Sequence, residues 1–218
     1  DDQEEFNLQA HSISLIAEKE IAGLDTASTY GYSRIFVGGG DFLGIHSLTP
    51  SIGYGVTPQW YVNANLNVQD KNFLENKDRN SRVHAAGVTN FLFFMDNKAN
   101  VSLGYRLEDE DTSSSEFDYL GHFLNASIKV PIPGRALAPW SPTATLGWAY
   151  FNKNYNSLTA SIADERKDER TTLTLDLEST LTERVKANFA YERIEAISNL
   201  DTADFNENIA TISFRVTF

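Results

Sequence analysis

The residues of this chain that could do chemistry are its histidines and its clustered carboxylates. The histidines are His11, His46, His84 and His122, and their spacing matches neither His-x-His nor His-Glu-x-x-His. The chain has no cysteine, which excludes thiolate-ligated metals, and no Gly-x-Ser-x-Gly nucleophile motif. We therefore predict no catalytic, metal-binding or cofactor-binding residue, no cofactor and no enzymatic activity.

A run of four acidic residues, Glu108–Asp111, is continued by Glu116 and Asp118. Carboxylate oxygens are ligands that Ca²⁺ and Mg²⁺ prefer, but this run lacks the spacing and the glycine of an EF-hand loop. The pattern is typical of a solvated loop tip. Capture of a divalent cation that bridges to lipopolysaccharide phosphates is the alternative hypothesis.

Length and composition limit the class of protein. The chain has 218 residues, a net charge of −12 and 41% hydrophobic residues, which fits one domain with a sizeable apolar surface. The acidic balance argues against nucleic acid as a partner, because phosphate contacts need clustered Lys and Arg. The longest apolar run is Phe91–Met95, far short of the roughly 18 residues of a membrane-spanning helix.

The elements that position these residues show a period of two, which indicates strands. The segment Trp60–Gln69 sets Trp60, Val62 and Leu66 on one face and asparagines on the other. Aromatic residues gather near the ends of the apolar face, and the polar face is rich in Asn, Ser, Thr and Gly. We predict an all-β, antiparallel chain with strands near 8–19, 28–38, 43–56, 59–70, 80–95, 98–108, 116–130, 143–156, 169–181, 184–197 and 206–218.

The connections between these strands alternate in character from residue 56 onward. Tight turns are expected at 57–58, 96–97 and 182–183, and long polar loops at 70–80, 109–115, 157–168 and 198–205. The connection 131–142 is apolar and bounded by prolines. Short turns at one end and long loops at the other are typical of transmembrane β-barrels, and soluble sandwiches do not sort their loops in this way.

The C-terminal segment Asn208–Phe218 resembles the insertion signal of bacterial outer-membrane β-barrels, with Phe214, Val216 and Phe218 as the signal residues. Segments such as Leu103–Arg106 and Phe189–Arg193 give residues 80–218 a weaker similarity to porin-like barrels, including those of surface lipoprotein assembly modifiers. The resemblance implies a place in the bacterial outer membrane. It also implies contact with outer-membrane lipid and lipopolysaccharide, with the barrel-assembly machinery and with other envelope proteins.

Strand number stays open between two values. Single-chain barrels have even strand counts, and the pattern shows eleven strands. A further short strand near residues 5–9 would give twelve, which we favour, and an N-terminal segment 1–27 outside the wall would give ten. We therefore divide the chain into an N-terminal segment, 1–27, that supplies extra strands or a periplasmic plug, and an outer-membrane barrel, 28–218.

Turning the polar face inward gives a set of charged residues that we expect to line the lumen. They are Arg82, Arg106, Lys129, Lys153, Asp176, Glu178, Lys186, Glu192 and Arg215. Such a mixture of signs suits a narrow passive pore for ions or small polar solutes. The alternative is a structural or accessory barrel with a closed lumen that anchors or binds other cell-envelope components.

Overall fold

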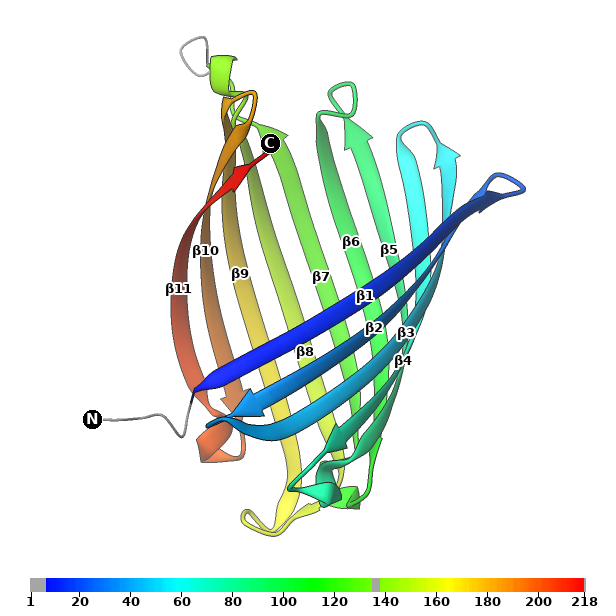
Figure 1. Ribbon diagram of the computed structural model, residues 1–218, viewed down its shortest axis with the longest axis vertical. Coiled ribbons are helices and arrows are strands. Elements are labelled where there is room, and N and C mark those ends of the chain that lie inside the picture. Colours follow the sequence, from blue (N-terminus) through cyan, green and yellow to red (C-terminus); the bar gives the residue numbers. More distant parts are fainter. Residues whose placement is uncertain (1–6, 135–137, 218) are drawn as a thin grey trace.

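The computed structural model describes residues 7–134 and 138–217, which form one antiparallel sheet (Figure 1). Its strands are β1 (Leu8–Ile21), β2 (Leu24–Val37), β3 (Gly40–Thr57), β4 (Trp60–Phe73), β5 (Ser81–Phe94), β6 (Ala99–Thr112), β7 (Tyr119–Pro131), β8 (Thr143–Thr159), β9 (Asp164–Thr182), β10 (Val185–Ser198) and β11 (Phe205–Val216). Short 3-10 turns lie at η2 (Lys77–Arg79), η3 (Ser115–Phe117), η4 (Ala138–Trp140) and η5 (Asp201–Ala203). No helix in the described ranges has the length and hydropathy needed to cross a bilayer.

Each strand pairs with its neighbour in the sequence, in the order β1 to β11. The predicted all-β, antiparallel architecture is therefore confirmed, and each predicted range overlaps one observed strand. Strands of 12 to 19 residues are much longer than the usual globular strand of about 5–6 residues. Such lengths suit a wall that crosses a bilayer at a tilt.

The connections fall at two ends of the sheet, which we call the turn end and the loop end. The turn end carries 22–23, 58–59, 95–98, 132–142 and 183–184, and the loop end carries 38–39, 74–80, 113–118, 160–163 and 199–204. The loop-end connections are shorter than the sequence predicts because the strands continue into the charged segments. There β8 runs to Thr159 and β9 starts at Asp164, so only four residues connect them.

The three consecutive glycines form a hairpin turn between β2 and β3. Gly38 and Gly39 have φ values of 57° and 78°, the left-handed region that a type I′ hairpin turn requires at both central positions. Gly40 begins β3. The glycines therefore reverse the chain between the two strands.

The sheet curls toward a barrel, and β1 and β11 are its two edge strands (Figure 1). Within the described residues β1 pairs only with β2, and β11 only with β10. Residues 8–27, which we assigned to an N-terminal segment, form β1 and the first part of β2. The described wall thus has eleven strands, one more than the ten-strand alternative and one fewer than the twelve that we favoured.

The curl gives the sheet an inner and an outer face, and β6 shows how they differ. On the outer face Leu103 is 57% exposed, whereas on the inner face Ser102 and Glu108 are each 9% exposed. Apolar side chains are therefore exposed and polar side chains covered, the reverse of a water-soluble sheet. This arrangement is expected of a wall with lipid on one side and a polar interior on the other.

Candidate functional site

The inner face carries charged side chains at both ends of the sheet, and these are the candidate site. The first group, the loop-end cluster, extends over strands β4 to β10. Its members are Lys71, Ser81, Arg106, Glu108, Glu110, Tyr119, Lys153, Tyr155, Arg166, Asp168 and Ser198.

Glu110 is the most connected carboxylate of the loop-end cluster. Lys71 Nζ lies 2.9 Å from both of its carboxylate oxygens, and Ser81 Oγ donates to Oε1 at 2.5 Å. The Glu110 residue is only 8% exposed. The register explains the contact. Lys71 of β4 lies opposite Ser81 of β5, and Val83, the next inner-face residue of β5, lies opposite Glu110 of β6. Three strands are thereby tied together by one charged pair.

A second carboxylate, Glu108, is the inner-face residue of β6 next to Glu110 on the turn-end side. It accepts a hydrogen bond from Tyr119 Oη at 2.6 Å and lies 3.3 Å from Arg106. Lys153 Nζ lies 3.7 Å from the centre of the Tyr119 ring, a cation–π contact that stabilises an ammonium group away from bulk water. Both signs of charge are thus held in fixed positions at this level.

The cluster continues on β8 to β10 around Asp168. Its Oδ1 accepts hydrogen bonds from Arg166 Nε at 2.8 Å and from Ser198 Oγ at 2.7 Å. Tyr155 Oη donates to Oδ2 at 3.3 Å. The sequence assigned these charges to a solvated loop, and the structure places Asp168 and Arg166 on the inner face of β9.

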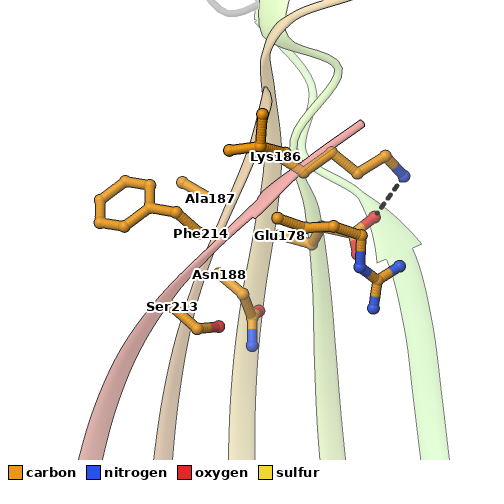
Figure 2. Close-up of a pocket in the computed structure, with 8 residues that line it drawn as sticks. Glu178, Lys186, Ala187, Asn188, Ser213 and Phe214 are labelled. Atoms are coloured by element: carbon orange, nitrogen blue, oxygen red, sulfur yellow. Dashed lines mark hydrogen bonds and ion pairs between the residues drawn. The ribbon is translucent and has the colours of Figure 1, made fainter. Parts of the chain in front are cut away.

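The second group, the turn-end cluster, lies on β9 to β11 and consists of Asp176, Glu178, Lys186, Asn188 and Arg215. Lys186 Nζ lies 3.2 Å from Glu178 Oε1, and Asn188 donates to Asp176 at 3.4 Å. Figure 2 shows this ion pair beside a pocket of about 440 Å³ at the β11 edge. This ion pair is more exposed than the Lys71–Glu110 pair of the loop-end cluster.

The structure places eight of the nine predicted lumen residues on the inner face. They are Arg106, Lys129, Lys153, Asp176, Glu178, Lys186, Glu192 and Arg215. Arg82 lies on the outer face, because its neighbours Ser81 and Val83 are the buried ones. Polarity misleads here, since the outer face is also polar beyond its apolar band.

The predicted insertion-signal residues lie partly within the described chain. Phe214 and Val216 are on β11 and are 65% and 51% exposed. Phe218 lies outside the described residues.

Sequence reasoning missed the roles of Lys71, Glu110 and Asp168. We interpreted Glu108–Asp111 as a loop tip, but β6 continues to Thr112 and alternates these residues, with Glu108 and Glu110 inside and Asp109 and Asp111 outside. Strict alternation from Val101 through Asp111 was the available signal. It was obscured because the outer-face residues change from apolar to acidic at Asp109.

Comparison with known proteins bears on the fold. Neither a protein-family model nor a curated protein sequence matches the chain. Among solved structures it is similar to OmpTdeltaL8, a loop L8 deletion mutant of an outer membrane protein of Vibrio cholerae, with a TM-score of 0.62 and 11% identity. It is also similar to the NanC porin, with a TM-score of 0.53 and 10% identity, and to the siderophore receptor PirA of Pseudomonas aeruginosa, with 0.52 and 12%.

Coverage differs among these structures. The match includes 94% of this chain and 62% of OmpTdeltaL8, all of this chain and 40% of PirA, and 96% of this chain and 94% of NanC. The chain thus spans less than two thirds of the length of OmpTdeltaL8 and of PirA. Its fold is that of bacterial outer-membrane β-barrel proteins, and the exposed apolar outer face agrees with that fold.

Proposed function

We propose that this chain forms a narrow pore through which ions or small polar solutes pass passively across the outer membrane. The observation that carries the proposal is the polar inner face with its two charged clusters. Fixed charges of both signs can replace part of the hydration of a passing solute. The extent of the match to the NanC porin, nearly the full length of both chains, supports the same function.

The proposed pore needs a closed wall, and we propose that a twelfth strand closes it. Both β1 and β11 run from the loop end to the turn end, so one strand antiparallel to both would pair with each of them. This agrees with the even strand counts of single-chain bacterial barrels. The interior would be narrow, because eight strands are already filled by side chains.

A structural or accessory barrel with a closed lumen is the second candidate, and the loop-end cluster favours it. The hydrogen bonds of Glu110, Glu108 and Asp168 join side chains of β4 to β10 at one level of the wall. Such a network could fill the cross-section and leave no conducting path. The barrel would then anchor or bind envelope components through its loops.

Single-channel conductance in a planar bilayer tests the proposal on the full refolded chain. We expect discrete steps, and we expect the double variant Glu108→Gln/Glu110→Gln to shift selectivity toward anions because two inner-face negative charges are removed. The matched control is Asp109→Asn/Asp111→Asn, which removes two charges from the outer face of the same strand. Its selectivity should equal that of the parent protein.

Folding is checked for every variant by heat-modifiable migration. A folded parent protein without conductance would contradict the pore and support the closed barrel. Equal selectivity shifts in the two double variants would show that the inner-face carboxylates do not line the path.

A further inference from the structure

All four histidines of the chain lie on the outer face, on alternate strands. His11 is on β1, His46 on β3, His84 on β5 and His122 on β7. The first three are exposed and His122 is half-buried. We call this set the histidine belt. The sequence spacing of the last three, 38 residues each time, reflects one hairpin per histidine.

The strand register repeats one step from each histidine to the next. His11 lies opposite Arg34, which lies opposite Gly44, and His46 is two residues further toward the turn end. The same two-residue step leads from His46 through Asp70 and Arg82 to His84, and from His84 through Asp109 and Leu120 to His122.

A constant step of this kind keeps the histidines at one height. Strands of a barrel are tilted, so a walk along the hydrogen bonds from strand to strand also moves along the barrel axis. In Figure 1, β1 rises toward the turn end, and the neighbouring strands follow below it. Residues paired with one another from β1 to β7 therefore lie progressively nearer the loop end. Each histidine is two residues nearer the turn end than the residue paired with the previous one, and this shift compensates for the tilt.

The height of the belt is the loop-end boundary of the apolar band. The next outer-face residues toward the turn end are all apolar: Ile13, Leu48, Ala86 and Leu124. On β2, β4, β5 and β6 the charged outer-face residues lie at the belt or beyond it, namely Arg34, Asp70, Arg82, Asp109 and Asp111. Head groups of membrane lipids are found at such a boundary.

Two of the histidines are held by tyrosines in equivalent positions. Tyr30 Oη lies 2.9 Å from His46 Nδ1, and Tyr105 Oη lies 2.8 Å from His122 Nδ1. In both pairs the tyrosine is on the preceding strand. When the phenol donates to Nδ1, the neutral imidazole carries its proton on Nε2, which leaves an N–H donor for a ligand.

We propose that the histidine belt, together with Arg82, binds the phosphate groups of lipids in the outer leaflet. Longer loops of outer-membrane barrels are extracellular, so the loop end faces outward. Imidazole N–H and guanidinium groups donate to phosphate oxygens while the acyl chains cover the apolar band below. The proposal rests on the outer-membrane location of the chain and not on whether the barrel conducts.

Each histidine of the belt faces residues of the neighbouring strands. His11 faces Arg34, His46 faces Asp70 and Tyr32, His84 faces Asp109 and Val68, and His122 faces Leu107, Asn152 and Tyr105. Arg34 is itself paired with Asp41. The aspartates offset the charge of Arg82, and the imidazoles add N–H donors beside it.

The test uses the full refolded chain in maltoside micelles, which contain no phosphate. The chain is titrated with phosphorylated lipid A and, separately, with the same lipid after removal of its phosphates. Bound lipid is counted by native mass spectrometry. We expect the chain to prefer the phosphorylated lipid. We expect the variant His11→Gln/His46→Gln/His84→Gln/His122→Gln to bind the phosphorylated lipid about tenfold more weakly than the parent chain.

A matched control variant, Asn154→Gln/Asn206→Gln, changes outer-face residues of β8 and β11 near the loop end without removing an imidazole. Its lipid binding should equal that of the parent chain. Parent-like binding by the folded four-histidine variant would overturn the proposal, and so would equal binding of the dephosphorylated lipid. Displacement of lipid A by millimolar inorganic phosphate would reassign the belt to free phosphate and also overturn it.

Discussion

Charged side chains of this protein differ in how much each contributes to stability, and burial decides the difference. The Lys71–Glu110 pair has side chains 22% and 10% exposed, whereas the Lys186–Glu178 pair is 48% and 42% exposed. A covered charge that loses its partner keeps its desolvation cost, but an exposed charge regains water. The two pairs therefore form a natural comparison on one face of one sheet.

We predict that Glu110→Ala lowers the free energy of unfolding by about 2–4 kcal/mol, because Lys71 and Ser81 lose their acceptor. Glu178→Ala should change it by less than about 1 kcal/mol. Urea unfolding of the chain in phospholipid vesicles, followed by tryptophan fluorescence, measures both. Equal losses in the two variants would contradict the role assigned to burial.

At the scale of the strands, one tyrosine side chain crosses a glycine of the next strand and contacts the strand beyond it. Tyr61 of β4 extends over Gly53 of β3, and its hydroxyl donates to Asp25 Oδ2 of β2 at 3.0 Å. A Cβ at Gly53 would overlap the tyrosine hydroxyl, whereas a Cβ at Gly55, on the same strand, would meet no atom within 4 Å. The missing side chain at Gly53 thus leaves room for the Tyr61 side chain to reach Asp25.

We predict that Gly53→Ala destabilises the protein by about 1–3 kcal/mol through this overlap. Gly55→Ala should be nearly neutral. Adding Tyr61→Phe to Gly53→Ala removes the overlapping oxygen, so the double variant should recover part of the loss. Thermal and urea unfolding of the parent chain, of the single variants Gly53→Ala and Tyr61→Phe and of the double variant completes this cycle. A Gly53→Ala chain as stable as Gly55→Ala would contradict the close approach.

The strands could be predicted from the sequence because outer-face residues such as Leu66 and Leu103 alternate with polar ones through the apolar band. That signal ends where the wall leaves the band. Arg82 was therefore assigned to the wrong side, and Glu110 and Asp168 were assigned to loops. Which charges meet depends on register between strands, and no local pattern around Lys71 encodes its pairing with Glu110, 39 residues away.

At the scale of the whole molecule, the two edge strands are the part of the wall whose backbone needs a further partner in a membrane. Every residue of β1 and of β11 is exposed, and within the described residues each strand has one unpaired edge. About half of the backbone groups of an edge strand point away from its only partner. In the hydrocarbon core each unsatisfied group costs several kcal/mol, so closed barrels are the sheets that span membranes.

We therefore predict that the amides of β1 and β11 exchange with deuterium as slowly, in an outer-membrane-like bilayer, as those of β5 and β6, which are paired on both sides. Slow exchange at both edges requires a partner strand, and the parallel direction of β1 and β11 makes a single antiparallel strand the simplest one. Hydrogen exchange of the full chain, resolved by peptide mass spectrometry, measures all four strands together. Rapid exchange confined to β1 and β11 would show that the wall stays open there and would remove the basis for a sealed pore.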